Sequence, residues 1–343
     1  MEPQDELAHR GAQNLVNNHL RVREGECVVV FHRHADAVLP IIRAALEEAK
    51  ARVECVSLAP WNAIVDDREF ARLVAERVRN VQASMYLSSV DGPAYPRSRL
   101  LVDALNNTGV RHLQVPGVSA RMLATSLRAD PTLIEQVNQR LVERLEAGRL
   151  LTVTSPAGTD VTVALSRNFP VVGYCGIPMP GAWDSVPTGA VSFYSPNVSG
   201  TYVADRIARG SYLGGTNSQL HKTPLTLRLS SSMLQKSECE DAALVEELAT
   251  HLAKDEQSGR VGFVSFSTNY LTKNELRVFA NDALLPGLRL MLGYSDQTKT
   301  KAPHTAAVWA TFLGRRQTVA IDGQVLVRDG RLDSKWTAGI LPF

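Results

Sequence analysis

The feature that most constrains this fold is a short apolar segment, CVVVFH at residues 27–32, which a helical pattern and then a second apolar segment follow. A continuous run of β-branched residues is typical of a strand that is buried on both faces. Residues 40–51 have apolar side chains on one side of a helix, and VECVSLA follows at residues 53–59. Two strands joined by a helix in this way predict a parallel β-α-β unit with a right-handed crossover.

The same alternation continues along the first third of the chain. It predicts further helices at residues 70–78 and 97–105 and further strands at residues 84–88 and 112–115. A longer helix is expected from Asp130 to about Gly148, because Asp is a good N-cap and Pro131 suits the first turn. We therefore expect residues 1–149 to form an open α/β domain.

The pattern of the sequence changes after residue 149. Segments rich in Val, Thr and Ser, such as LLTVTSP and DVTVALS, alternate with Gly and Pro, which is typical of strands and turns. We expect strands at residues 155–160 and 186–196, a helix at residues 241–254, and a β-hairpin around the Asp-Gly turn at Gly323. Residues 150–343 are thus predicted to form a strand-rich α+β domain.

Charge and composition argue against several classes of protein. The net charge of +2 gives no basic surface of the kind that binds nucleic acid. No run of about 18 apolar residues is present, and the first ten residues, MEPQDELAHR, lack the apolar core of a signal peptide, so we expect no membrane association. The four cysteines have no metal-ligand spacing, which favours a reduced, cytoplasmic protein.

Seven segments of the chain follow one another in a distinctive order: SPAGTDVTVAL, PGAWDSVPTGAVSFYSP, GTYVAD, GFVSFSTN, LPGLRLMLG, KAPHTAAVW and VAIDGQVLVRDGRL. This series resembles the motifs of the aminopeptidase T metallopeptidases and of their relatives, the dihydroxypyridine ring-opening dioxygenases. The order and the spacing make the resemblance specific. It implies an aminopeptidase T-like α/β fold, with an N-terminal open α/β domain and a strand-rich C-terminal domain.

The resemblance also implies where a metal site would lie. In those peptidases the ligands are two Glu, two His and one Asp. Matched motif by motif, the two Glu positions hold Ala190 and Phe263 in this chain, and one His position holds Arg289. The last motif, H-x-D, keeps His304 but has Ala306 in place of the Asp.

This set of residues does not make a metal site. A catalytic metal needs about three protein ligands and an open position, and a permanent cation such as Arg289 repels a metal at close range. A shift of one residue in the loosest segment would place Leu290 at that His position, and Leu290 is no ligand either. We therefore expect no metal, no cofactor and no residue of the family's metal-based catalysis.

A ligand-binding role remains as an expectation. Arg is almost never buried without a partner, so Arg289, together with His304, is a candidate to hold an anionic group such as a carboxylate. Aromatic groups of a ligand would lie near Trp183, Phe193, Tyr194 or Trp309. The candidate ligand-binding residues of the former metal cleft are therefore Ala190, Phe263, Arg289, His304, Ala306, Trp183 and Tyr194.

The function expected from these residues is peptide binding without catalysis. The chain resembles the peptide-binding proteins of crocagin-type ribosomal peptide biosynthesis, which implies a precursor peptide as the partner. The relatives are dimers, so the resemblance also implies a homodimer. Two alternatives stay open: an enzyme that acts on a peptide or small aromatic substrate by metal-independent chemistry, with His304 as general base, or a metal-dependent aminopeptidase or dioxygenase if the ligand positions are matched wrongly.

Overall fold

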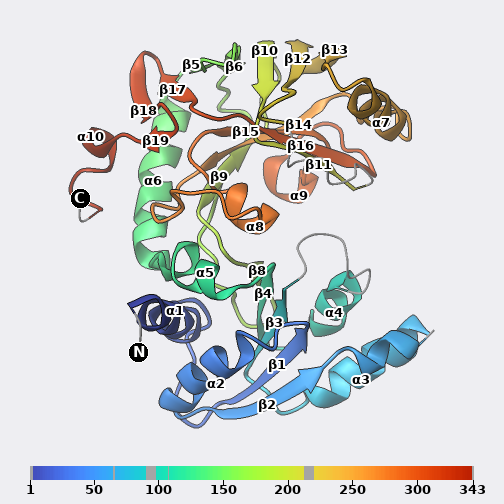
Figure 1. Ribbon diagram of the computed structural model, residues 1–343, viewed down its shortest axis with the longest axis vertical. Coiled ribbons are helices and arrows are strands. Elements are labelled where there is room, and N and C mark those ends of the chain that lie inside the picture. Colours follow the sequence, from blue (N-terminus) through green and yellow to red (C-terminus); the bar gives the residue numbers. More distant parts are fainter. Residues whose placement is uncertain (1–2, 65, 90–97, 107, 212–219, 342–343) are drawn as a thin grey trace. The chain divides into compact units, whose positions relative to one another are not determined.

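The computed structural model of the protein describes residues 3–64, 66–89, 98–106, 108–211 and 220–341 (Figure 1). The chain forms two compact units. The first comprises Met1–Ile134, Cys175–Thr188 and Asn274–Asp282, and the second comprises Glu135–Tyr174, Gly189–Lys273 and Ala283–Phe343. This division differs from the single expected boundary after residue 149, because two later segments return to pack with the first unit.

The first unit is built around a parallel sheet with the strand order β2-β1-β3-β4-β8. Its strands are β1 (Cys27–Arg33), β2 (Arg52–Ser57), β3 (Ala83–Ser88), β4 (Arg111–Pro116) and β8 (Trp183–Ser185). Strand β8 comes from the returning segment and pairs with β4, with His112 opposite Trp183. The expected α/β fold with parallel β-α-β units is confirmed.

Helices cover both faces of this sheet, because alternate residues of β1 point to opposite sides. Val28 and Val30 belong to a core on the side of α1 (Pro3–Asn14), α2 (Leu39–Glu48) and α5 (Ala120–Leu123) (Figure 1). Val29 and Phe31 belong to the core on the side of α3 (Asp67–Arg77) and α4 (Ser98–Leu105). The remaining short helical segments are η1 (Leu15–His19), η2 (Pro60–Ala63), η3 (Ser126–Arg128) and α8 (Phe279–Asp282).

The second unit contains two antiparallel sheets. The eight-stranded sheet has the order β13-β12-β10-β6-β5-β17-β18-β19, and the six-stranded sheet has the order β11-β16-β15-β14-β9-β7. The strands of the first are β5 (Leu150–Thr154), β6 (Asp160–Ala164), β10 (Val198–Ala204), β12 (Leu225–Ser230), β13 (Met233–Glu238), β17 (Thr318–Ile321), β18 (Gln324–Arg328) and β19 (Arg331–Leu332). Those of the second are β7 (Val171–Tyr174), β9 (Ala190–Phe193), β11 (Ile207–Gly210), β14 (Val261–Ser267), β15 (Leu288–Gly293) and β16 (Trp309–Leu313).

The sequence-based predictions for this unit are partly right. The hairpin around Gly323 is confirmed by the pairing of β17 with β18, and the expected helix is α7 (Ala242–Leu252). The strand expected at residues 155–160 is wrong, because those residues turn the chain between β5 and β6, with Gly158 at a φ of +104°. Of residues 186–196, only Ala190–Phe193 forms a strand, since Pro187 and Gly189 precede it.

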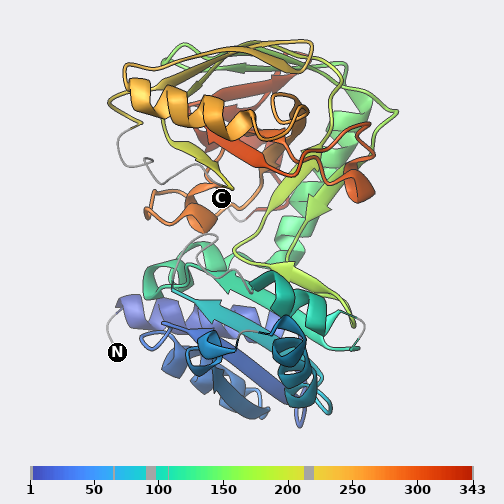
Figure 2. The ribbon, with the colours of Figure 1, turned by 90° about the vertical axis from the view of Figure 1, so that its right-hand side faces the viewer.

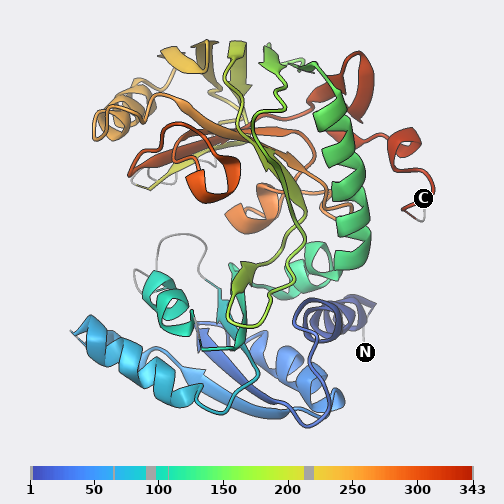
Figure 3. The same ribbon diagram turned by 180° about the vertical axis from the view of Figure 1, so that it is seen from behind.

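The two sheets of the second unit pack on each other through Tyr202 of β10. Its hydroxyl donates to the Leu288 carbonyl oxygen at 2.6 Å and accepts a hydrogen bond from Gln317 Nε2 at 3.0 Å. Most of α6 (Pro131–Ala147) runs along one side of this unit, and α7 lies on the other side (Figures 2 and 3). The short helices α9 (Gln297–Thr300) and α10 (Ser334–Thr337) complete it. None of the helices that the structure describes is long and apolar enough to span a membrane.

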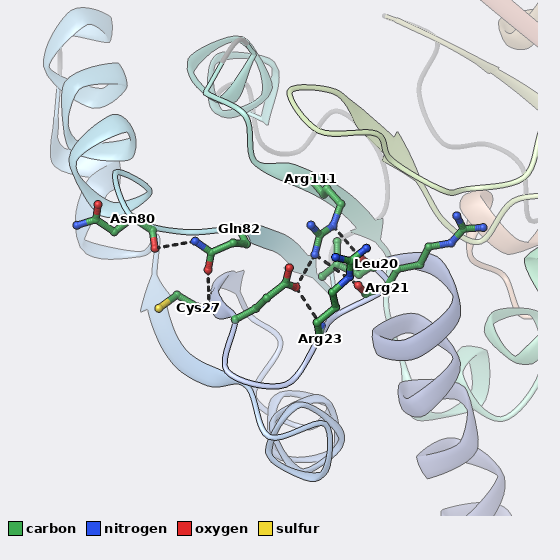
Figure 4. A network of polar contacts seen from close by, with 8 residues as sticks. Leu20, Arg21, Arg23, Cys27, Asn80, Gln82 and Arg111 are labelled. Carbon is green, nitrogen blue, oxygen red and sulfur yellow. Dashed lines mark hydrogen bonds and ion pairs between the residues drawn. The ribbon is translucent and has the colours of Figure 1, made fainter.

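A polar network fixes the end of η1 to the sheet of the first unit (Figure 4). Arg111, at the start of β4, donates to the Leu20 carbonyl oxygen at 3.1 Å and forms an ion pair with Glu26 at 2.6 Å. The exposed fractions of the two side chains are only 17% and 14%. Glu26 also accepts from the Arg23 amide at 3.0 Å. Removing Arg111 would leave a shielded carboxylate and a carbonyl without this donor.

We expect Arg111→Leu to lower the unfolding free energy of the first unit by about 2 kcal/mol, because a shielded carboxylate loses its partner. The matched control is Arg43→Leu, which removes the exposed pair of Arg43 with Glu47 on α2 and should cost less than about 0.5 kcal/mol. Urea titrations of the two variants, with hydrogen exchange of β1 and β4 as the readout, measure both losses of unfolding free energy. Equal losses in the two variants would contradict the role of the network.

Candidate functional site

In the six-stranded sheet of the second unit, one side is apolar, and the other side carries polar residues on the strands β7, β9, β14 and β15. In its register, Ser192, Ser265 and Arg289 lie opposite one another on the adjacent strands β9, β14 and β15. Directly paired residues of an antiparallel sheet point to the same side, and their neighbours along the strand point to the other. The apolar face is buried and carries Val191, Phe193, Val264, Phe266, Leu288, Leu290 and Phe312.

The opposite side, called the polar face here, carries Tyr174, Ala190, Ser192, Tyr194, Phe263, Ser265 and Arg289. Helix α9 lies on this side of the sheet, away from the eight-stranded sheet (Figures 1 and 3). Ser192 Oγ donates to Ser265 Oγ at 3.0 Å, and Lys299 Nζ of α9 lies 4.7 Å from the centre of the Tyr174 ring. The face therefore combines hydroxyl groups, aromatic rings and cations.

Three of the residues singled out in the sequence lie together on the polar face. Ala190, Phe263 and Arg289 come from the adjacent strands β9, β14 and β15, and the pairing places each on the same side. Leu290, the alternative to Arg289, points to the buried apolar face and is fully buried. The register thus favours Arg289 as the residue that occupies the position of the missing His.

His304 and Ala306 lie in the segment between α9 and β16. The His304 ring meets the Tyr194 ring edge to face, with centroids 5.6 Å apart, and Tyr194 meets Phe169 in the same way at 4.7 Å. Ala306 is buried. His304 is therefore a neighbour of Tyr194, the last aromatic residue of the polar face.

Trp183 is different, because it lies in β8, which belongs to the sheet of the first unit. It is an edge-strand residue with 45% of its surface exposed. The structure does not join it to the polar face of the second unit. Its place in the proposed ligand site therefore stays a prediction.

Arg289 is a half-buried cation that has no anionic partner in the described part of the chain. Its Nε atom is buried and makes no hydrogen bond to any described residue. Burial lowers the pKa of the guanidinium, and the nearby Tyr174 and Tyr202 hydroxyls act in the opposite direction. Since Arg stays protonated in proteins, a positive charge lies on the same side of the sheet as the hydroxyls of Ser192 and Ser265. Such a group favours an anion beside it.

A second arginine, which the sequence analysis missed, lies on the same face. Arg260 directly precedes β14, and Val261 pairs with Leu292 of the apolar side, so Arg260 points to the polar side. Its Nε is also buried without a hydrogen bond to a described residue. The only signal in the sequence was its position two residues before the GFVSFSTN motif.

The donor set of the polar face does not fit a metal ion. Of the positions that correspond to metal ligands in the resembling families, Ala190, Phe263, Arg289 and Ala306 have no ligating group, and His304 alone does. Among the residues that the structure describes, no three His, Cys, Asp or Glu side chains are arranged to hold a metal. No step of a metal-based reaction can be assigned to these residues.

The fold defines the class of the protein, a dioxygenase- and aminopeptidase-like scaffold. The chain is similar in structure to the 2,5-dihydroxypyridine dioxygenase from Pseudomonas putida KT2440, with a TM-score of 0.63, 18% identity, and coverage of 97% of this chain and 99% of that one. It is also similar to wild-type AmpT from Thermus thermophilus, with a TM-score of 0.66, 17% identity, and coverage of 95% and 99%. At these identities the likeness establishes the fold alone.

The family follows from the sequence profile. Residues 14–261, well over half of the chain, match the family described as NicX, 2,5-dihydroxypyridine 5,6-dioxygenase. The chain belongs to this family. No curated protein sequence matches it.

Proposed function

We propose that this protein binds a peptide without cleaving it and that the polar face of the six-stranded sheet holds an anionic group of that peptide. The observation that carries the proposal is Arg289. A half-buried arginine whose Nε atom is shielded from water normally has a partner there, because an unpaired buried polar group is costly. Here the Nε atom of Arg289 has none among the described residues. A carboxylate of a ligand would supply it.

The residues around Arg289 support binding rather than turnover. Ala190 and Phe263 occupy positions where the resembling enzymes have metal-ligating carboxylates, so the face has lost ligands but kept hydroxyl and aromatic groups. Peptides combine carboxylates with aromatic side chains, and Tyr194 and Phe263 offer rings for the latter. A protein that holds a peptide intact suits the presentation of a precursor peptide to modifying enzymes in natural-product biosynthesis.

We expect Arg289→Leu to weaken peptide binding about 30-fold, which corresponds to the loss of about 2 kcal/mol from one charge-assisted hydrogen-bonded contact. The probe is a mixture of random hexapeptides with free C-terminal carboxylates, captured on immobilised protein, identified by mass spectrometry and then titrated singly by calorimetry. The matched control is Arg228→Leu, because Arg228 lies on β12 and is paired with Glu238. Unchanged affinity in Arg289→Leu, with the fold intact by circular dichroism, would remove Arg289 from this role.

The absence of catalysis has its own test. The captured peptides are incubated with the protein alone and with zinc, iron(II) or manganese(II), and their masses are followed. We expect intact peptides in every case, and no consumption of 2,5-dihydroxypyridine in the presence of iron(II). Cleavage of a peptide, or ring opening of the pyridine, would overturn the non-catalytic part of the proposal.

A further inference from the structure

The polar face has a second group of unpartnered polar atoms, apart from Arg289. Arg260 Nε and His304 Nε2 are both buried, and neither makes a hydrogen bond to a described residue. Both lie near Tyr194, whose ring packs against His304. Buried donors without partners are rare in folded proteins, so two of them together need an explanation.

The charge of Arg260 affects the pKa values of both His304 and Tyr194, which indicates that the three side chains lie near one another. Burial lowers the pKa of His304, the charge of Arg260 lowers it further, and a hydrogen bond with the Val261 backbone acts in the opposite direction. Burial raises the pKa of Tyr194, and Arg260 partly offsets this effect. No carboxylate balances Arg260, which forms no ion pair with any residue that the structure describes. A positive group beside an imidazole ring, which becomes protonated more readily when an anion lies next to it, is suited to an anion.

The distance between the two arginines follows from the strand register. Arg289 is level with Ser265, and Arg260, which directly precedes β14, lies five residues before Ser265. One of those residues is taken up by the bulge between Val261 and Phe263, which leaves about four residue steps, or about 13 Å at 3.3 Å per residue. Phe263 and Tyr194 lie between the two ends.

We propose that Arg260 and His304 form a second anion-binding point, so that the ligand is an extended peptide of about five residues with one anionic group at each end. This inference rests on the proposed peptide-binding function. An extended chain spans about 13 Å in four residue steps, which matches the spacing of the two arginines. Its middle residue lies over Phe263, a partly exposed ring beside the buried Tyr194, where an aromatic or apolar side chain is favoured.

The test uses three acetylated pentapeptide mixtures, each with phenylalanine in the middle and the second and fourth positions randomised. The first has an acidic first residue and a free C-terminal carboxylate, the second has a neutral first residue, and the third has a C-terminal amide. By calorimetry, we expect the first mixture to bind the unmodified protein at least about 10-fold more tightly than either of the others.

The two arginines are then removed separately. Arg260→Leu and Arg289→Leu should each weaken binding of the dianionic mixture about 10-fold or more. Each variant should also lose the preference for one anionic end and keep the preference for the other. Arg228→Leu should bind as the unmodified protein does. The His304 pKa, followed by NMR, should rise when the dianionic peptide binds, since a nearby anion favours the protonated ring.

The outcomes separate this inference from the proposed function. If Arg289→Leu weakens binding and Arg260→Leu does not, the second anion-binding point is wrong and the proposed function stands. If neither variant changes the affinity, or if the unmodified protein binds none of the three mixtures at millimolar concentration, both are wrong. Loss of opposite preferences in the two variants establishes both anion-binding points.

Discussion

At pH 5 the first unit is expected to be about 4 kcal/mol less stable to unfolding than at pH 7.5, because two of its histidines are buried in the neutral form. His112 is fully buried on β4, and burial lowers its pKa to about 3. Its ring nitrogens lie 2.8 Å from Ser84 Oγ and 2.9 Å from Gln114 Nε2. Among the described residues, only a hydrogen bond with the Ser84 backbone opposes the shift, and no acidic group favours the protonated form.

His19, at the end of η1, behaves in the same way. Burial lowers its pKa to about 4, while the Gly176 and Ala129 carbonyl oxygens and Asp130 oppose the shift. Its Nδ1 lies 2.8 Å from the Gly176 carbonyl oxygen, so this nitrogen carries the proton of the neutral ring. The returning segment that contains Gly176 is therefore fixed to the first unit in part through His19.

The sign of the effect follows from proton uptake. In the unfolded chain both histidines titrate near their usual pKa of 6.5, whereas in the folded unit they titrate near 4 and 3. Between these values the unfolded state binds more protons, so stability is complete above about pH 7 and falls as the pH drops. At pH 5 each histidine accounts for about 2 kcal/mol.

Urea titrations at a series of pH values from 7.5 to 5, with hydrogen exchange of β1 and β4 as the readout, measure this slope. His112→Gln should be less stable at pH 7.5, but its loss between pH 7.5 and 5 should be smaller by about 2 kcal/mol. His34→Gln, which removes an exposed histidine of the same unit, is the matched control. An identical slope in His112→Gln and the unmodified protein would show that His112 is not buried as a neutral ring.

The sequence predicted helices and strands well where the hydrophobic pattern of the segment itself determines its secondary structure. The continuous apolar run from Val28 to Phe31 predicts a strand covered on both faces, and α1 and α3 provide this cover. Trp183–Ser185 joins the first unit through pairing with β4, about 70 residues earlier in the chain. No local pattern encodes such a pairing, so the sequence could not divide the two units correctly.

The candidate site shows the same limit. Motif order placed Ala190, Phe263 and Arg289 in one site, and the register of β9, β14 and β15 brings them onto one face. Arg260 escaped notice because its direction depends on the bulge between Val261 and Phe263, which shifts the alternation by one residue. Bulges leave no clear signal in a single sequence, so an arginine beside one cannot be assigned to a face from its spacing.

Gly189, the glycine that precedes β9, should be the most sensitive position of the second unit. Its φ of +115° is a conformation that side chains with a Cβ rarely adopt. A Cβ at this position would lie 2.7 Å from the Asn269 backbone nitrogen and 2.9 Å from its Cα. The Gly189 carbonyl oxygen also accepts from the Thr268 amide at 2.8 Å, so neither backbone can move away without breaking this hydrogen bond.

We expect Gly189→Ala to lower the unfolding free energy of the second unit by about 4 kcal/mol, as the sum of backbone strain and a clash with the main chain. For a unit of this size the melting temperature should fall by about 10 °C. Gly323→Ala is the matched control, because Gly323 also has a positive φ, +83°, but a Cβ there would meet nothing within 4 Å. It isolates the cost of the dihedral angle, which we expect to be about 1 kcal/mol. Calorimetric melting of both variants measures the difference. Equal effects of the two substitutions would mean that the close approach of Asn269 does not constrain residue 189. The expected difference of about 3 kcal/mol would show that a glycine is required there, because the backbone before β9 and the backbone after β14 are in contact.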